Sequence, residues 1–237
     1  MLIPLYINLS KRIVRINDFY VYITKYMENS FGNKPYRIIE GFTDAAINLK
    51  VGNNYINKNA IMYAGALFEK FGLRVLLDAF CEIDGNYELW LFGNGDMEKE
   101  IELYSLRDTR IKYFGNRPND EILEFEKKAK LLVNPRFTDN EFTKYSFPSK
   151  LMEYMSSGTP VLTTKLLGIP DDYFDKMFYI EIENKEGFKR SILNCLSLSQ
   201  EELDLFGNNA KYYVLQEKNN FIQINKLINI LNESFTK

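Results

Sequence analysis

The sequence predicts an α/β fold built on a doubly wound, six-stranded parallel sheet. From residue 59 onward, apolar strand patterns alternate with helical patterns, and short turns separate them. This alternation is typical of a parallel sheet covered by helices on both faces. The predicted strands cover 59–66, 87–93, 111–115, 131–137, 160–164 and 177–183, and the predicted helices cover 71–83, 97–107, 119–129, 149–157 and 186–197. Six strands with five crossovers predict a nucleotide-binding sheet of the Rossmann type.

The segments on either side of this sheet have a different character. Residues after 199 show helical spacing without a strand pattern, and Ser199 followed by Glu202 predicts a capping box. Before residue 50 the sequence predicts a helix, a strand, a short helix and a strand. About 45 residues cannot bury these apolar faces alone. We therefore expect a whole domain over 36–200, preceded by the remnant of a second domain over 1–35 and followed by helices over 201–237 that pack back on that second domain.

Composition excludes several classes of function. Lys and Arg number 30 against 32 for Asp and Glu, without a long like-charged block, so no nucleic-acid partner is expected. The chain contains no histidine, which removes imidazole-based catalysis. Cys81 and Cys195 lie in apolar segments and are predicted core residues of a protein in a reducing compartment.

The sequence also carries no pattern typical of a targeting or membrane-spanning segment. The start lacks a basic region followed by an apolar one, and every apolar run is shorter than about 18 residues. We expect a cytoplasmic protein without a transmembrane segment, with peripheral docking at the inner face of the membrane left open.

The stretch "YSFPSKLMEYMSSGTPVL" (145–162) predicts a helix followed by a buried strand. Ser146 or Phe147 would start the helix, Pro148 would lie in its first turn, and Gly158 would end it. Its apolar stripe, expected to face the sheet, consists of Leu151, Met152 and Met155.

A second face of this helix carries Ser149, Lys150 and Glu153, which are three or four residues apart. A helix N-terminus exposes unpaired N–H groups that suit a phosphate, and ligands of open α/β sheets bind beyond the carboxyl ends of the strands. Lys150 is thus a candidate ligand of a diphosphate, and Glu153 of the paired hydroxyls of a ribose. The alternative is a surface ion pair between them, worth about 0.2–0.5 kcal/mol.

Four motifs carry a resemblance to a known family: "YAGALFEKFGLRVLLDAF" (63–80), "LWLFGNGD" (89–96), "LLVNPR" (131–136) and "FPSKLMEYMSSGTPVLTTKLLGIP" (147–170). In order and spacing, residues 36–200 resemble the C-terminal, nucleotide-sugar-binding domain of family 4 (group 1) glycosyltransferases, which have the GT-B fold. The pattern "NPR…YSFPSK…EY…G.PV" is similar to the branch that makes capsular polysaccharides and exopolysaccharides. The resemblance implies that most of the N-terminal domain is missing.

The resemblance also implies roles for individual residues. Glu153 occupies the place of the second glutamate of the family's E-x7-E motif and is expected to bind the donor ribose. Tyr145 holds the place of the first glutamate, so the usual carboxylate contact to the donor sugar is missing. Glu141 is a candidate substitute, or else a solvated loop residue. Ser146 and Ser149 complete the donor-binding residues predicted around this helix.

A basic pair usually follows the first strand of this domain in the family. Here Gly65, which is expected to lie against the donor, precedes Ala66 where an arginine is common, and Lys70 lies one place from the expected lysine. Lys150 and Arg136 are therefore the candidate catalytic residues, which would stabilise the leaving diphosphate. The alternative for Arg136 is a cap or a buried ion pair.

Two glycine-containing loops follow the next strands. A tight turn is the favoured interpretation of "GNGD" (93–96). In "GNRPND" (115–120), Arg117 lies beside the base in the family arrangement, or Asn119 only caps the next helix. The aromatic side chains on the strands are predicted core residues: Tyr87, Trp90, Phe92 and Tyr113.

The sequence does not predict a metal site. It contains no D-x-D motif, and neither Asp139 with Glu141 nor Asp171 with Asp172 offers the convergent ligands that a divalent cation needs. We expect neither a metal nor a cofactor, because lysine, arginine and the helix dipole can balance the charge of a diphosphate.

The resemblance implies a retaining glycosyltransferase, or its donor-binding half, that uses a nucleoside-diphosphate sugar, with a UDP-sugar favoured. The expected acceptor is a glycan or lipid-linked molecule in cell-surface polysaccharide synthesis. The alternative is a catalytically silent nucleotide-sugar-binding module or partner subunit. The uncovered apolar faces predict self-association or a separate chain that carries the N-terminal domain.

Overall fold

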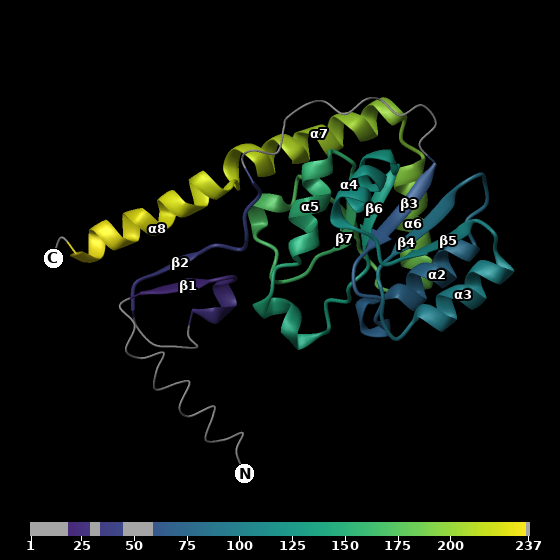
Figure 1. The fold of residues 1–237 in the computed structure, drawn as a ribbon, viewed down its shortest axis with the longest axis horizontal. Helices are drawn as coiled ribbons and strands as arrows, with labels where there is room; N and C mark the ends of the chain where they lie inside the picture. The colour runs from purple at the N-terminus through teal and green to yellow at the C-terminus, as the bar shows by residue number, and fades with distance from the viewer. Residues whose placement is uncertain (1–18, 29–33, 45–58, 236–237) are drawn as a thin grey trace, which may run out of the picture.

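Figure 1 shows the computed structural model of the chain, which describes residues 19–28, 34–44 and 59–235. The predicted six-stranded parallel sheet is confirmed, with the strand order β5-β4-β3-β6-β7-β8. Its strands are β3 (Ala60–Ala64), β4 (Glu88–Phe92), β5 (Ile111–Gly115), β6 (Leu131–Asn134), β7 (Val161–Thr164) and β8 (Phe178–Ile180). The strand order reverses between β3 and β6, so their carboxyl ends form the switch point at which open sheets bind ligands.

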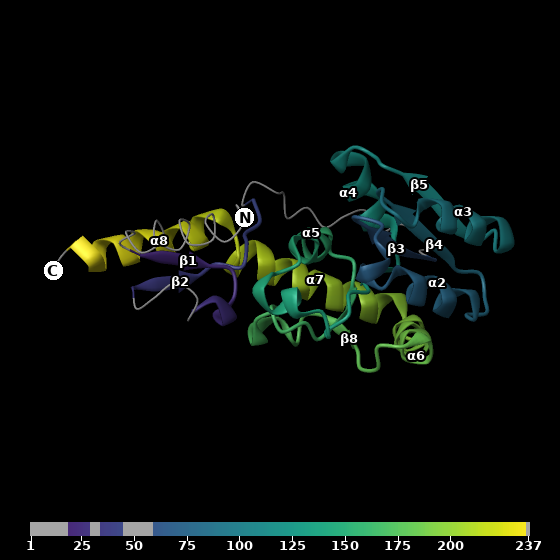
Figure 2. The same ribbon diagram turned by 90° about the horizontal axis from the view of Figure 1, so that it is seen from below.

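Helices cover both faces of the sheet, as the alternating pattern predicted. The crossover helices are α2 (Leu73–Cys81), α3 (Glu98–Arg107), α4 (Asn119–Lys128), α5 (Ser149–Ser157) and α6 (Lys185–Leu196). One core packs α2, α3 and α6 against the sheet, and a second core packs α4 and α5 against the opposite face. Figure 2 shows α4 and α5 on the other side of the sheet from α2 and α6. Because both faces are covered, β3, β6 and β7 are entirely buried.

The terminal helices are α7 (Gln200–Glu217) and α8 (Asn220–Phe235). The predicted capping box of Ser199 and Glu202 is confirmed at the start of α7. Helix α7 packs against α5, and a Cβ at Gly207 would lie 2.1 Å from the carbonyl oxygen of Gly158, so the two backbones approach closely. No helix of the described residues is long and apolar enough to cross a membrane.

A small second sheet precedes the large one. Strand β1 (Tyr20–Tyr22) pairs in parallel with β2 (Tyr36–Ile38), and the 3₁₀ turn η1 (Lys25–Met27) lies between them. Figure 1 shows β1, β2 and α8 side by side, away from the six-stranded sheet. The expected domain boundary between residues 35 and 36 falls within this small sheet and stays a prediction. The helix expected before residue 19 lies outside the described residues.

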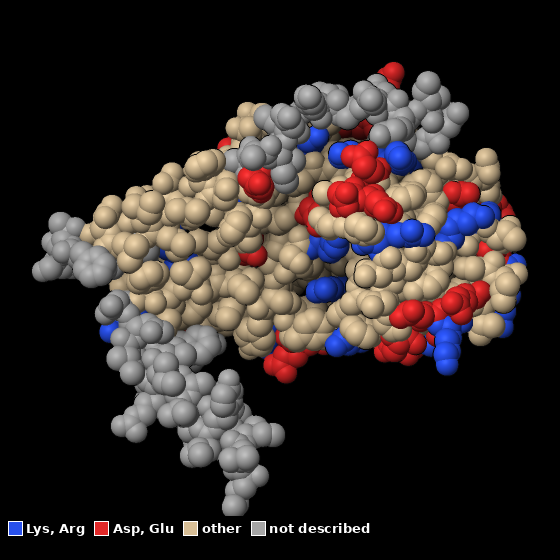
Figure 3. Space-filling view, viewed as in Figure 1, with Lys and Arg blue, Asp and Glu red and all other residues tan. Residues whose placement is uncertain are grey.

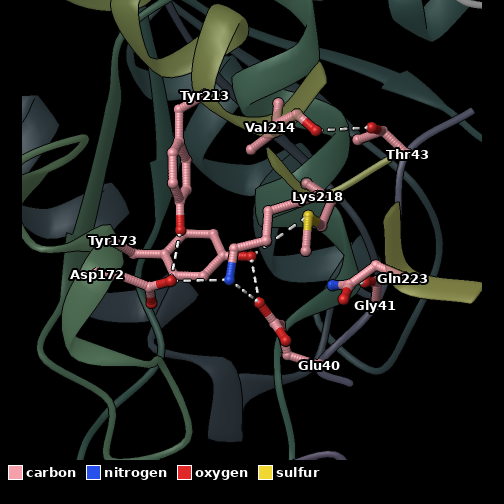
Figure 4. A network of polar contacts seen from close by, with 10 residues as sticks. Glu40, Gly41, Thr43, Asp172, Tyr173, Tyr213, Val214, Lys218 and Gln223 are labelled. Carbon is pink, nitrogen blue, oxygen red and sulfur yellow. Dashed lines mark hydrogen bonds and ion pairs between the residues drawn. The ribbon is translucent and has the colours of Figure 1, made fainter. Parts of the chain in front are cut away.

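A buried polar network joins this small sheet to the large domain (Figure 4). The Lys218 ammonium lies 2.6 Å from a carboxylate oxygen of Glu40 and 2.8 Å from one of Asp172. Tyr173 donates a hydrogen bond to Glu40, and Tyr213 donates one to Asp172. Glu40 follows β2, Asp172 and Tyr173 form the turn η4 (Asp171–Tyr173), and Lys218 ends α7. These contacts fix the segment after β2 to both the sheet domain and the terminal helices.

The structure corrects three details of the sequence prediction. Cys195 is buried, but Cys81 is exposed, because it is the last residue of α2 and borders a polar surface hollow. Strand β6 ends at Asn134 rather than at residue 137, because Pro135 has no N–H to donate to the sheet. Helix α5 begins at Ser149, as the predicted range 149–157 gave. The residue before it is Pro148 with extended backbone, so the expectation that Ser146 or Phe147 starts the helix with Pro148 in its first turn was wrong.

Candidate functional site

The first turn of α5 brings together Ser149, Lys150 and Glu153, as the helical spacing predicted. Leu151 and Met155 are buried against the sheet, which leaves the polar residues on the other face. Lys150 donates a hydrogen bond to the carboxylate of Glu153, so the ion pair of the alternative interpretation is present. Their side chains are 32% and 24% exposed, which means that a ligand can reach the pair from solvent.

A pocket of about 310 Å³ lies beside this pair. Ser149 and Glu153 line its α5 wall, Asn119 and Leu123 line its α4 wall, and residues 42–44 close another side. This volume falls in the range of roughly 300–1,000 Å³ typical of small-molecule sites. Asn119 is the first residue of α4, the N-cap is Pro118, and no side chain caps this helix, so the alternative that Asn119 only caps α4 is not supported. Arg117 is exposed and donates to the carbonyl of Phe114.

Behind the Lys150–Glu153 pair lies a carboxyl group that the sequence did not single out. Glu126 of α4 has a fully buried side chain, and its Oε1 lies 4.0 Å from the Lys150 ammonium. Burial raises the pKa of Glu126 far above its usual range, and the charge of Glu153 adds to this shift. The signal in the sequence is that Glu126 follows the buried Ile122 by four residues, and so lies on the apolar face of α4.

Tyr154 ties α5 to the switch point of the sheet. Its hydroxyl donates a hydrogen bond to the carbonyl of Ala64 and accepts one from the N–H of the same residue. Because Ala64 ends β3 and Tyr154 lies in the second turn of α5, these two bonds fix α5 beside the carboxyl end of the first strand of the sheet. The sequence prediction did not include Tyr154, since a tyrosine beside an apolar stripe gives no sign of its partner.

Arg136 lies just beyond the carboxyl end of β6. Its guanidinium carbon is 4.5 Å from the centre of the Phe71 ring. Burial lowers the pKa of Arg136. Among the described residues no Asp or Glu forms an ion pair with this group, so the ion-pair alternative is not seen there. On the face of the molecule seen in Figure 1, Figure 3 shows Lys and Arg side chains beside a hollow in the middle.

The glycine loops at the ends of β3 and β4 lie against each other. A Cβ at Gly93 would lie 1.9 Å from the carbonyl oxygen of Gly65, and Gly93 has a φ of 122°. A Cβ at Gly95 would lie 2.3 Å from the carbonyl oxygen of Leu67. These contacts confirm the tight-turn interpretation of "GNGD" and leave Gly65 half-buried at the switch point.

The residues before α5 lie apart from the pair on its first turn. Glu141 has an 81% exposed side chain and forms an ion pair with Lys144, which is the arrangement of a solvated loop residue. Tyr145 is exposed, with the Lys144 ammonium 4.9 Å from its ring centre. Ser146 donates a hydrogen bond to the carbonyl of Phe142. The donor-sugar roles of these residues stay predictions.

The strand aromatics and Asp172 serve the fold. Phe92 is buried, and the other three strand aromatics pack against the two cores: Tyr87, Trp90 and Tyr113. Asp172 belongs to the buried network around Lys218. Within the described residues, no group of three or more His, Cys, Asp or Glu is arranged to hold a metal ion.

The sequence model of a protein family described as "Glycosyl transferases group 1" matches residues 58–197, which is more than half of the chain. The chain belongs to this family. The matched range runs from β3 to α6 and contains both strand ends of the switch point and all of α5. The family resemblance that the sequence motifs predicted is therefore confirmed.

Two curated relatives of this chain are longer than the chain itself. The chain is 25% identical over 205 residues to the uncharacterized glycosyltransferase MJ1178 of Methanocaldococcus jannaschii, and this alignment covers 83% of the chain and 54% of the relative. The chain is 30% identical over 139 residues to the amylovoran biosynthesis glycosyltransferase AmsK of Erwinia amylovora, and this alignment covers 55% of the chain and 34% of the relative. The chain therefore spans about half the length of the first relative and about a third of the second.

Solved structures share the fold of this chain. Anabaena HepE, crystallised with UDP and glucose, superposes with a TM-score of 0.74 at 15% identity, over 95% of this chain and 66% of HepE. Sucrose-phosphate synthase from Thermosynechococcus elongatus gives a TM-score of 0.75 at 16% identity, over 96% of this chain and 61% of that protein. The expected GT-B fold is confirmed.

Proposed function

We propose that this group 1 glycosyltransferase binds a nucleoside-diphosphate sugar, with a UDP-sugar favoured, and supplies the donor half of a retaining transfer reaction. The acceptor is a glycan or lipid-linked molecule in cell-surface polysaccharide synthesis. AmsK is named for amylovoran biosynthesis, WcaL of Salmonella typhimurium is named for colanic acid biosynthesis, and HepE was crystallised with UDP. The observation that carries the proposal is the Lys150–Glu153 pair on the first turn of α5, beside the 310 Å³ pocket.

The nucleoside enters the pocket between α4 and α5, and Glu153 accepts hydrogen bonds from the two ribose hydroxyls. Glu153 is suited to this role because it is half-buried, paired with Lys150, and lines the pocket. A carboxylate that accepts from two hydroxyls makes charge-assisted hydrogen bonds, which are the stronger kind. Asn119 on the opposite wall lies within the same pocket and contacts the base.

The diphosphate lies between the start of α5 and the switch point of the sheet. The unpaired N–H groups around Ser149, together with the helix dipole, favour an anion at this place. Lys150 contributes a positive charge from α5, and Arg136 contributes a second one from beyond β6. Arg136 forms no ion pair among the described residues, so its charge is available to a phosphate. Gly65 has no side chain and lets the diphosphate approach the backbone.

The chemistry is departure of the diphosphate from the anomeric carbon of the sugar. Negative charge grows on the leaving oxygen as this bond breaks, and the fixed charges of Lys150 and Arg136 stabilise it. No metal is needed for this step, because two cations and a helix N-terminus face the diphosphate. The alternative of a silent binding module is not favoured by membership of an enzyme family, and an assay for donor hydrolysis or transfer distinguishes the two.

Calorimetric titration with UDP tests the donor site. We expect Glu153→Gln to weaken UDP binding by about 10- to 100-fold, because hydrogen bonds to a charged group are worth about 1.5–3 kcal/mol. The matched control is Glu82→Gln, which neutralises a glutamate paired with Lys185 and Lys189 on the far face of the sheet. The control should bind UDP like the unchanged protein. Equal affinity of the Glu153 variant, or no binding of UDP or GDP by the unchanged protein, would contradict the proposal.

A further inference from the structure

We propose that Glu126 is a positioning residue of the donor site, a neutral carboxylic acid that donates a hydrogen bond from α4 to Glu153 of α5. The bond holds the Glu153 carboxylate at the edge of the pocket in the orientation that ribose hydroxyls require. This inference rests on the proposed function, because it assigns a supporting group to the ribose-binding residue.

Burial makes Glu126 unusual. Its side chain is completely inaccessible to solvent, and within the described part of the chain neither carboxyl oxygen receives a hydrogen bond from a donor. A buried ionised carboxylate without donors is strongly disfavoured, because its lost hydration is not replaced. The cation nearest to it, the Lys150 ammonium, is 4.0 Å away and already hydrogen-bonded to Glu153. Glu126 is therefore neutral.

A neutral carboxyl group is itself a donor, and Glu153 is the acceptor beside it. The pKa of Glu126 is raised first by burial and then by the charge of Glu153. Both carboxyl groups face Lys150, so the three side chains form one unit with a single negative and a single positive charge. This balance explains how three ionisable groups share a largely buried place between α4 and α5.

The contact between Glu126 and Glu153 affects how Glu153 is held when a nucleotide binds. Glu126 approaches Glu153 from the protein interior, whereas the pocket lies on the side lined by Ser149 and Glu153. A hydrogen bond from the interior keeps Glu153 in place when Lys150 turns toward a diphosphate. Without Glu126, the Glu153 carboxylate would be held by Lys150 alone, and nucleotide phosphates would compete for the same ammonium.

The same contact makes donor binding sensitive to pH. When Glu126 loses its proton, it becomes a second negative charge beside Glu153 and no longer donates. The ionisable groups that face Glu126 come from both helices: Lys127 on α4, and Lys150, Glu153 and Tyr154 on α5. The two lysines favour the ionised form and so lower the pKa of Glu126, whereas burial and the charge of Glu153 raise it more and move ionisation to alkaline pH.

Two substitutions of Glu126 separate positioning from packing. Glu126→Gln keeps the shape and supplies an amide N–H that donates to Glu153, so UDP affinity at pH 7 should stay within about threefold of the unchanged protein. Glu126→Leu fills the same space without a donor and should weaken UDP about tenfold, the equivalent of one hydrogen bond to a charged acceptor. Glu121→Gln, at an exposed position of the same helix, is the control and should leave UDP affinity unchanged.

The pH profile of UDP affinity gives a readout that loss of packing would not produce. Between pH 7 and 9 the phosphates of UDP are already ionised, since the second pKa of a phosphate monoester is about 6. Affinity of the unchanged protein should fall over this range, and affinity of Glu126→Gln should not. A profile of Glu126→Gln that parallels the unchanged protein overturns the inference, and this comparison remains decisive if Glu126→Leu does not fold.

A double-mutant cycle tests whether Glu126 acts through Glu153. In a Glu153→Gln background, Glu126→Leu should cause no further loss of UDP affinity. An equal loss in both backgrounds overturns the inference, and so does unchanged UDP affinity of Glu126→Leu alone. If the unchanged protein binds no nucleotide, the proposed function fails and the inference fails with it. Absence of UDP binding is distinguished from failure of the inference alone, in which UDP binds and substitutions of Glu126 leave its affinity unchanged.

Discussion

Glu126 also sets how the stability of the fold responds to pH. Its pKa is raised in the folded protein, by burial first and by Glu153 second, whereas an unfolded chain has a glutamate pKa of about 4.3. Between these two values the folded state holds one proton more than the unfolded state. The free energy of unfolding therefore falls as pH rises, by up to about 1.4 kcal/mol per pH unit from this group.

Replacement of Glu126 by glutamine removes this titration. We expect the difference in free energy of unfolding, Glu126→Gln minus the unchanged protein, to rise by about 1 kcal/mol per pH unit between pH 6 and 8. Urea unfolding at several pH values measures both curves. A constant difference across this range would mean that Glu126 is ionised in the folded protein.

The residues of the site differ in how far the sequence could predict them. Ser149, Lys150 and Glu153 share one helix, so their common face follows from a spacing of three and four residues. Glu126 and Tyr154 act through residues 27 and 90 positions away, Glu153 and Ala64 respectively. No local pattern contains such contacts, because they arise when α4, α5 and β3 pack together. The one sign of Glu126 in the sequence is a glutamate at a position on the apolar face of α4.

Among the elements, the turn between η2 (Glu69–Phe71) and α2 supports the ring beneath Arg136. Gly72 has a φ of 80°, and a Cβ there would lie 2.0 Å from the carbonyl oxygen of Pro135. Gly72→Ala should therefore lower the free energy of unfolding by about 2–4 kcal/mol, from left-handed strain and from overpacking. Because Phe71 and Arg136 adjoin the two clashing residues, UDP affinity should fall as well.

Gly115→Ala is the matched control for this turn. Gly115 has a φ of 67°, but a Cβ there would meet no atom within 4 Å. Only the conformational cost of about 1–2 kcal/mol should appear. Urea midpoints of the two variants give the comparison. Equal losses would show that the approach to Pro135 is relieved by a small backbone shift.

Elements were predicted better than their ends. All six strands and five crossover helices follow from alternating apolar patterns, and β5 and α5 have the predicted bounds. The end of β6 shifted for a local reason, which is that Pro135 has no N–H to donate to the sheet. The pairing of β1 with β2 is a parallel contact across an intervening segment. Such a pairing depends on the surrounding structure more than on either strand.

At the scale of the whole molecule, the small sheet and α8 present apolar side chains to solvent. On β1 and the turn after it, Val21 and Ile23 are exposed, and on α8 Phe221, Ile224 and Ile228 are exposed. Together with the length of the curated relatives, this supports the proposal that residues 1–35 belong to an N-terminal GT-B domain and that 201–237 pack back on it. A longer form of the chain, a separate chain or a second copy would supply that surface.

The network around Lys218 is the connection that holds these outer segments to the sheet domain. Lys218→Met leaves the Glu40 carboxylate, whose side chain is 3% exposed, without its cation. Breaking one side of a buried ion pair costs about 3–5 kcal/mol, so the free energy of unfolding should fall by that amount. Lys189→Met is the control, because its partner Glu82 is a surface residue that keeps Lys185, and it should cost less than about 0.5 kcal/mol.

The place where Lys218→Met first opens the structure shows whether Lys218 connects the outer segments to the sheet domain or stabilises the whole fold. Glu40 follows β2 and Lys218 precedes α8, so Lys218→Met should expose both segments to protease before the six-stranded sheet unfolds. Limited proteolysis with mass spectrometry should detect early cuts near residues 39–44 and 217–220. Adding Glu40→Gln should restore part of the lost stability, because the second change removes the buried unpaired charge. A double variant no more stable than Lys218→Met would assign the loss to packing of the lysine stem between Tyr173 and Tyr213, whose ring centres lie 4.9 and 5.6 Å from the ammonium.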